Sequence, residues 1–236
     1  MIARTLQSPS TSAIAVVNYN QAMAISDLRR EYEGQSLDEQ DVARDPIEQF
    51  ARWFEAAIQS SGFIEANAMT LATADASGRP DARTVLLKEF DERGFVFFTN
   101  YHSRKAQELA ANPRVSLLFY WSGLNRQVRI DGTVEKISRE ETRAYFITRP
   151  RESQLAAWAS PQSEVVANRA ALEARYEEIA QRFANTPVIE PPEHWGGYRV
   201  IPAVIEFWQG RPARFHDRLR YTREADGSWL IERLAP

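Results

Sequence analysis

The spacing of apolar residues along the chain predicts four helical segments. The first is predicted to begin after Asp45 and to end at Gly62, because an N-cap, a first-turn proline and then apolar residues at helical spacing follow one another. Ser103 can cap a second, short helix. Ser138 opens a capping box for a third, running towards Arg149, and a fourth covers residues 167–183.

Eight further segments have the composition and the period of strands. They are residues 68–74, 83–88, 95–99, 114–121, 127–136, 198–208, 213–220 and 228–234. Asp226-Gly227 between the last two is a hairpin signal. Since strands do not alternate regularly with helices, the pattern predicts an α+β fold with a mostly antiparallel sheet and inserted helices. A barrel is favoured because closure hides strand edges.

Composition limits the chemistry. The 236 residues include no cysteine, which excludes disulfides and thiolate chemistry. The net charge of −3 does not imply a nucleic-acid-binding face, and no apolar run approaches the ~20 residues that span a membrane. Residues 1–24 are expected to be a disordered leader of a cytoplasmic protein.

No motif for metal, phosphate-loop, dinucleotide or serine-nucleophile chemistry is present, and the three histidines (His102, His194, His216) lack metal-ligand spacing. No metal is therefore expected. A bound organic cofactor is the natural route to demanding chemistry in such a chain.

Four groups of residues are candidate anion sites. They are the strand Arg83–Lys88, the helix start Ser103-Arg104-Lys105, the set Tyr145, Arg149 and Ser153, and the segment Arg214–Arg218. Arginine forks and helix N-termini suit phosphate. Each group has an ordinary alternative as a solvated face.

Two of these groups carry a geometric expectation. Tyr145 and Arg149 are expected on one helix face, with a break at Pro150 that lets Ser153 approach them. Arg214, His216 and Arg218 are expected on one face of a strand, with Asp217 on the other. Three such groups in a row repel one another unless an anionic or π-rich ligand lies over them.

From Ile25 to Pro236 the chain resembles the pyridoxamine 5′-phosphate oxidase family. The matching segments are Leu28–Tyr32, Arg83–Lys88, Thr99–Lys105, Asn112–Ser116, Arg126–Val128, Tyr145–Ser153, Gln162-Ser163, Ile205–Gly210, Arg214–Arg218 and Glu232–Pro236. The resemblance implies a split β-barrel that binds FMN at a homodimer interface. Residues 25–236 would form one domain, with residues 194–236 as its dimerisation and substrate segment.

The resemblance also implies site residues. Around FMN it implies Arg83, Thr84, Val85, Leu86, Leu87, Lys88, Phe98, Thr99, Arg104, Lys105, Gln127, Gln162, Ser163, Trp208 and Arg218. Around the substrate it implies Arg29, Arg30, Glu31, Tyr32, Lys88, Tyr145, Arg149, Ser153, Arg214, Phe215 and His216. Arg214 and His216 are the expected catalytic pair, over the pyridine ring. Arg29–Tyr32 resembles a mobile covering segment, although the following Gln35–Asp41 is acidic where relatives are often basic.

The implied reaction is FMN-dependent oxidation at C4′ of pyridoxamine or pyridoxine 5′-phosphate. It would use O₂ and give pyridoxal 5′-phosphate and H₂O₂, with ammonia from the amine, as part of vitamin B6 synthesis. Two alternatives stay open. One is a related split-barrel flavin oxidase acting on another aromatic compound, such as a phenazine precursor. The other is a flavin- or pyridoxal-phosphate-binding protein without turnover.

Overall fold

The structure, a computed structural model, describes residues 25, 28, 30–60 and 65–236. Residues up to Glu31 form one unit, and residues from Tyr32 to Pro236 form a second. The leader expected at residues 1–24 lies outside the described residues. The single domain expected over residues 25–236 and the cytoplasmic location stay predictions.

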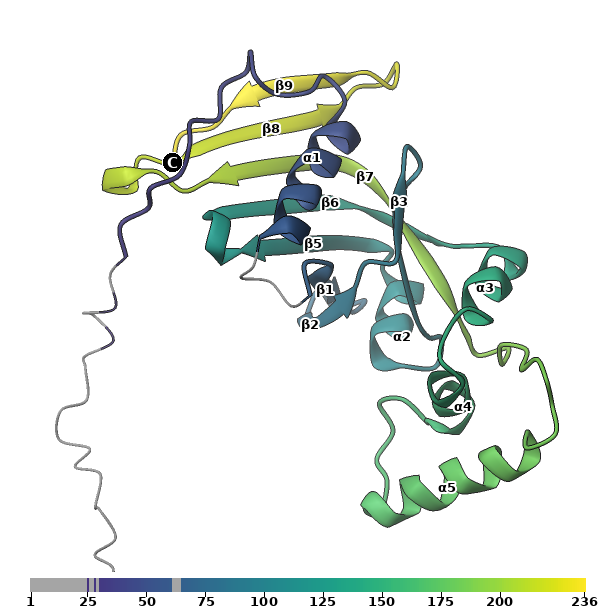
Figure 1. Cartoon of the computed structure of the whole chain (residues 1–236). Coiled ribbons are helices and arrows are strands. Elements are labelled where there is room, and N and C mark those ends of the chain that lie inside the picture. The colour runs from purple at the N-terminus through teal and green to yellow at the C-terminus, as the bar shows by residue number, and fades with distance from the viewer. Residues whose placement is uncertain (1–24, 26–27, 29, 61–64) are drawn as a thin grey trace, which may run out of the picture. The chain divides into compact units, whose positions relative to one another are not determined.

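A nine-stranded antiparallel sheet runs through the second unit (Figure 1). Its strands are β1 (Ala68–Ala74), β2 (Pro80–Leu86), β3 (Glu89–Asp91), β4 (Gly94–Asn100), β5 (Arg114–Trp121), β6 (Arg126–Lys136), β7 (Trp195–Gln209), β8 (Asp217–Arg223) and β9 (Trp229–Arg233). Their order is β2-β1-β5-β6-β7-β4-β3, with β8 pairing with β7 and β9. The predicted α+β class and antiparallel sheet are confirmed. The extra strand, β3, has only three residues.

Strand β7 is the longest, with 15 residues, and it pairs with three others. Its first half pairs with β4, its second half with β8, and both halves with β6. One register shift interrupts the β6 ladder: Asp131 faces Val204, but the next residue, Gly132, faces Pro202. Ala203 is thus the extra residue of a bulge.

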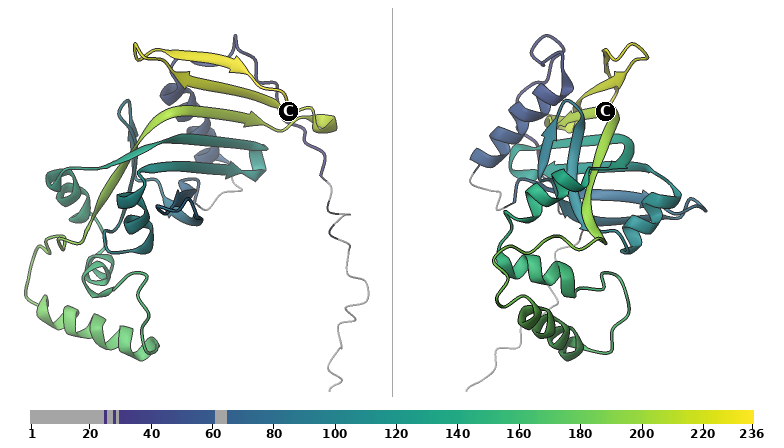
Figure 2. Two further views of the ribbon diagram at one scale, coloured as in Figure 1. Left: turned by 180° about the vertical axis from the view of Figure 1, so that it is seen from behind. Right: turned by 90° about the vertical axis from the view of Figure 1, so that its right-hand side faces the viewer.

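Helix α1 (Pro46–Gln59) lies along one face of the sheet (Figures 1 and 2). Asp45 caps this helix as predicted, because its side chain accepts hydrogen bonds from the backbone amides of Ile47 and Glu48 in the first turn. Phe50, fully buried, meets Phe95 and Phe119 edge-on at centroid distances of 5.0 and 5.1 Å. Burying such a ring stabilises the fold by about 2–3 kcal/mol.

The remaining helices are α2 (Arg104–Ala111), α3 (Arg139–Phe146), α4 (Arg151–Ala159) and α5 (Arg169–Arg182). The capping box at Ser138 is present. However, α3 ends at Phe146, short of the predicted Arg149, and α4 was not predicted. Both differences centre on Pro150, which ends one helical run and stands at the N-cap of the next.

In the part of the chain that the structure describes, no helix has the length and apolar content needed to cross a bilayer. The same residues contain no group of three or more histidine, aspartate or glutamate side chains placed to hold a metal ion.

Candidate active site

A cavity of about 330 Å³ collects predicted site residues from β2, β4, α2, α3, the α3–α4 turn and the segment after α4. We call it the basic cavity. It is lined by Arg83, Thr84, Val85, Leu86, Lys88, Phe98, Thr99, Lys105, Tyr145, Arg149, Gln162 and Trp195. Residues far apart in sequence thus meet in one cavity.

The electrostatics of the basic cavity favour an anion. Four of its lining residues, Arg83, Lys88, Lys105 and Arg149, are cationic, and none of the described residues that line it is acidic. Lys105 donates hydrogen bonds to Gln162 Oε1 at 3.0 Å and Thr99 Oγ1 at 3.3 Å. Burial, and then the neighbouring charge of Arg83, lower the pKa of Lys105. The charge of a bound anion would oppose both effects, because it stabilises the protonated amine.

Arg149 gives the clearest indication that the basic cavity can bind an anion. Its guanidinium lies 4.6 Å from the Trp195 ring centroid, yet its Nη1 atom is buried without a hydrogen-bond partner. Burial lowers the pKa of Arg149. Leaving a buried donor unsatisfied costs about 1–3 kcal/mol, more when it is charged, so a phosphate oxygen at this atom would be strongly favoured.

Three stacked rings form one wall of the basic cavity. Phe98 stacks on Tyr145 at 4.0 Å and on Trp195 at 5.2 Å. Burial raises the pKa of Tyr145, so its hydroxyl keeps its proton and can donate to an anion. Sequence reasoning missed Trp195, because the predicted strand began at Tyr198. The position of Trp195 directly before Gly196-Gly197 was the one sequence feature that could have indicated it.

Two further residues absent from the prediction organise the cations. Glu108, nearly buried, accepts hydrogen bonds from Thr73 at 2.6 Å, Arg104 at 2.9 Å and Arg83 at 3.1 Å. Asp81 pairs with Arg83 at 2.7 Å. Desolvation opposes ionisation of Glu108, but the hydrogen bonds from Thr73, Arg104 and Arg83 outweigh it and lower its pKa. Arg104 lies beside the basic cavity but does not line it.

A second set of predicted residues meets elsewhere. Tyr32 lies edge-on to His216 at 5.3 Å and to Trp208 at 5.7 Å, and the Arg214 guanidinium lies 5.5 Å from the Tyr32 ring centroid. We call Tyr32, Trp208, Arg214 and His216 the aromatic cluster. Gln127 and Arg218 adjoin it, because each is the cross-strand neighbour of Trp208.

The strand predicted over residues 213–220 is wrong in its first half. Pro212–Arg214 forms a 3₁₀ turn, and β8 begins only at Asp217. Ala213 and Arg214 have left-handed backbone angles (φ 55° and 62°), a conformation that costs about 1–2 kcal/mol per residue. Arg214, His216 and Arg218 therefore do not form a row on one strand face. This strained turn instead aims Arg214 at Tyr32.

Other predicted residues also differ from expectation. Arg149 lies beyond the end of α3, so it does not share a helix face with Tyr145. Ser153 lies in the first turn of α4 and does not line the basic cavity. Leu87 is buried in the core, whereas Phe215 is 76% exposed.

Ser163 is exposed beside Gln162 and has a positive φ of 73°. Arg29 lies outside the described residues. Arg30 and Glu31 belong to the first unit, so their relation to either set stays a prediction.

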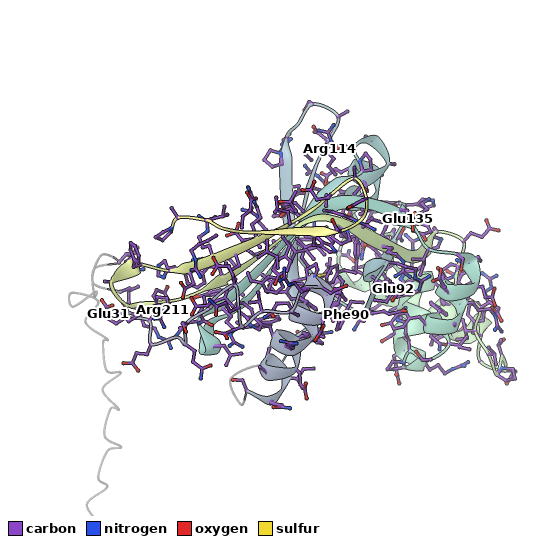
Figure 3. All side chains as sticks on the ribbon, turned by 90° about the horizontal axis from the view of Figure 1, so that it is seen from above. Glu31, Phe90, Glu92, Arg114, Glu135 and Arg211 are labelled. Carbon is purple, nitrogen blue, oxygen red and sulfur yellow. The ribbon has the colours of Figure 1, made fainter. Side chains whose placement is uncertain are left out.

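Within one chain, the basic cavity and the aromatic cluster lie at opposite ends of β7. Trp195 begins that strand and Trp208 is its penultimate residue. At about 3.3 Å per residue, they lie roughly 40 Å apart along the strand. Figure 3 labels Arg211, just after β7, at one end of the sheet and Glu135, in the β6–β7 ladder, towards the other.

Comparison with known proteins places the chain in a family. Residues 54–183 match the family model described as pyridoxamine 5'-phosphate oxidase, and residues 195–236 match the model for the pyridoxine 5'-phosphate oxidase C-terminal dimerisation region. A pyridoxine/pyridoxamine 5'-phosphate oxidase of Ralstonia pickettii is 58% identical over 213 residues, which is 90% of this chain and 99% of the relative. That of Paraburkholderia phymatum is 59% identical over 212 residues, again 90% and 99%.

Solved structures agree on the fold. PhzG of Burkholderia lata, crystallised with tetrahydrophenazine-1-carboxylic acid, has a TM-score of 0.80 and 30% identity, covering 88% of this chain and all of PhzG. An FMN-binding protein of Nostoc punctiforme related to pyridoxamine 5'-phosphate oxidase has a TM-score of 0.65 at 20% identity, covering 86% of this chain and all of the other. The predicted split barrel is confirmed, and the chain belongs to the pyridoxine/pyridoxamine 5'-phosphate oxidase family.

Proposed function

We propose that this protein oxidises pyridoxine and pyridoxamine 5′-phosphates to pyridoxal 5′-phosphate, with FMN as its cofactor. Pyridoxine phosphate and O₂ would give the aldehyde and H₂O₂. Pyridoxamine phosphate would also consume water and release ammonia. Besides family membership, one observation carries the proposal: the basic cavity gathers four cations, one of which, Arg149, has a buried Nη1 atom without a hydrogen-bond partner.

The residues present fit FMN. Its phosphate needs cationic donors, which Arg83 and Lys105 supply, and its flat ring suits aromatic and main-chain surfaces. When bound, FMN would accept two electrons from the substrate and pass them to O₂. The residues proposed to hold it are Arg83, Thr84, Val85, Leu86, Leu87, Lys88, Phe98, Thr99, Arg104, Lys105, Gln127, Gln162, Ser163, Trp208 and Arg218.

The substrate phosphate is proposed to bind Lys88, Tyr145, Arg149 and Ser153. Arg149 would form the charge-assisted hydrogen bond that its Nη1 atom lacks. Phe215 and residues 29–32 are proposed as further substrate-binding residues. Arg214 and His216 are proposed to orient the pyridine ring and to handle protons. Their task is alignment, which removes much of the entropic cost of bringing the reacting atoms together.

A complete site needs two chains under this proposal. The phosphate-binding cations and the ring-orienting pair lie at opposite ends of β7, too far apart to contact one small substrate. The C-terminal region is of the dimerisation type, which suggests a homodimer. We propose that one protomer's basic cavity faces its partner's aromatic cluster, with FMN between them.

Titration with substrate tests the proposal. Purified protein reconstituted with FMN should lose its flavin absorbance without oxygen on addition of either vitamer phosphate, and should release H₂O₂ when oxygen returns. Unphosphorylated pyridoxine is the control and should react far more weakly. Bound flavin that neither phosphate reduces would refute the oxidase and favour a binding protein without turnover.

The same anaerobic titration tests the alternative that the substrate is a phenazine precursor. Reduction by a tetrahydrophenazine carboxylic acid, but by neither vitamer phosphate, would favour it. Tyr145 and Arg149 argue for the phosphate, since both line the basic cavity, where they would supply a hydroxyl and a guanidinium to one anion.

A further inference from the structure

Arg233, at the end of β9, joins two separate parts of the chain. Its Nη1 atom donates to Asp217 Oδ1 at 2.7 Å. Its Nε and Nη2 atoms donate to the two carboxylate oxygens of Glu39 at 2.9 and 2.8 Å. Nη2 also donates to the Leu37 carbonyl at 2.9 Å and to Asp38 Oδ1 at 3.3 Å. One guanidinium thus holds three carboxylates and a carbonyl.

The segment on one side of this cluster runs from Tyr32 to Glu39, and other bonds fix it to the same loop. The Leu37 amide donates to Asp217 Oδ2 at 3.1 Å, and Arg211 Nη1 donates to the Gly34 carbonyl at 2.7 Å. Gly34 lies so close to Gly210 that a Cβ atom there would come within 2.2 Å of the Gly210 carbonyl oxygen. The segment is therefore docked on residues 209–217 along its length.

Both ends of the Arg233 cluster lead directly to the aromatic cluster. Asp217 follows His216 in the chain, and the docked segment begins with Tyr32, whose ring contacts His216 and Trp208. The hydrogen bonds of Arg233 go to Leu37, Asp38, Glu39 and Asp217, so Arg233 fixes the backbone on both sides of the aromatic cluster.

The charges explain why acidic residues stand in this segment. Arg233 would otherwise face Asp217 alone, whereas Asp38 and Glu39 complete its hydrogen bonding. The hydrogen bond from Arg233 is the largest cause that lowers the pKa of Glu39. Because the Arg233, Asp38 and Glu39 side chains are 37%, 53% and 46% exposed, salt will weaken these pairs.

We propose that Arg233 is a positioning residue that fastens the segment Tyr32–Glu39, so that Tyr32 is a fixed wall beside His216 before substrate arrives. This inference rests on the proposed function for its effect on turnover. Fastening removes the entropy cost of ordering Tyr32 on binding, so it acts on KM rather than on the chemical step.

The test compares Arg233→Gln with a matched control, Arg223→Gln, on the same face and at the other end of the β8–β9 hairpin. Arg223 lies over Trp229. In Arg233→Gln we expect faster amide hydrogen exchange across residues 32–39, and a KM for pyridoxine phosphate raised about tenfold with kcat little changed. FMN should stay bound. Arg223→Gln should change neither the amide exchange across residues 32–39 nor the KM.

A second variant, Asp38→Asn with Glu39→Gln, should act in the same direction. Added to Arg233→Gln it should give almost no further effect, since both remove the same contacts. The Asp38→Asn, Glu39→Gln variant can replace Arg233→Gln in both measurements if Arg233→Gln does not fold. High salt should speed amide exchange across residues 32–39 in the wild type but not in the variants.

Two results would overturn the proposal. Unchanged exchange across residues 32–39 in Arg233→Gln would show that the segment is not fastened there. Faster exchange with an unaltered KM would show that fastening does not position Tyr32 for substrate. The exchange measurement needs no turnover, so it judges the fastening even if the oxidase assignment fails.

Discussion

Trp195 and Trp208 belong to the same strand, β7, yet each is part of a different half of the candidate site. Trp195 stacks on Phe98 in the basic cavity, and Trp208 lies 4.7 Å from His216 in the aromatic cluster. The strand that joins the two halves in the chain also keeps them apart in space.

This separation predicts complementation between inactive variants. Arg149→Ala damages the basic cavity and His216→Ala the aromatic cluster, so each homodimer should be nearly inactive. Equal mixing with subunit exchange gives half mixed dimers, each with one intact site, and should recover about a quarter of wild-type turnover. Recovery of H₂O₂ production measures it. No recovery, with exchange shown by mass spectrometry, would mean that one chain supplies the whole site.

Arg149→Ala should weaken the binding of phosphorylated substrates specifically. Losing one charge-assisted hydrogen bond of about 1.5–3 kcal/mol raises KM roughly 10–100-fold. Arg143→Ala is the matched control, because Arg143 lies on the preceding helix and pairs with the exposed Glu190. Steady-state kinetics with pyridoxine phosphate decides the matter. An equal loss of activity towards unphosphorylated pyridoxine would contradict a phosphate role.

FMN affinity should fall at alkaline pH because of Lys105. The protonated amine of Lys105 is proposed to bind the FMN phosphate. Burial, and then the charge of Arg83, lower the pKa of this amine below the ordinary 10.5 in the free protein. As pH rises, the amine loses its proton before pH 10.5 is reached, and the affinity for FMN should therefore begin to fall at a pH lower than 10.5. Flavin fluorescence on release, followed against pH, measures this. Lys105→Arg should move the fall to higher pH, and an unchanged profile would remove Lys105 from the phosphate site.

His216 should be neutral at physiological pH. Burial, and then the charge of Arg214, lower its pKa from 6.5, and its Nδ1 atom accepts a hydrogen bond from the Arg211 amide at 3.1 Å. The unfolded chain takes up a proton first as pH falls, so His216 contributes stability that is lost below pH 6.5. Nuclear magnetic resonance titration of the imidazole should show a higher pKa in Arg214→Ala. A lower value there would contradict the Arg214 contribution.

Elements with regular patterns could be predicted from sequence closely. The strands over residues 68–74 and 114–121 were predicted to the residue, because alternating burial leaves a strict period of two. Asp45 and Ser138 marked helix starts, because a cap is a local hydrogen bond between near neighbours. Charged residues that converge on the basic cavity could be named from family resemblance.

Long-range relationships could not be predicted from local pattern. The local sequence around Arg214 does not indicate two successive residues in the left-handed conformation. The alternation of side chains there favours a continuous strand. The acidic residues Asp38 and Glu39 have their partner, Arg233, almost at the other end of the chain. Likewise, the alignment of Gln127, Trp208 and Arg218 follows from the register of three strands, which no single segment encodes.

The bulge at Ala203 controls the orientation of both half-sites. Side chains alternate along a strand, so Trp195 and Trp208, one even and one odd in number, would point to opposite sides of an unbroken β7. The extra residue resets the alternation. In the β6 register Trp208 lies opposite Gln127 and Tyr198 opposite Lys136, so these two residues point to opposite sides, and Trp195, three residues before Tyr198, points to the same side as Trp208. Deleting Ala203 would turn one half of the site towards the wrong surface without touching any residue that binds a ligand.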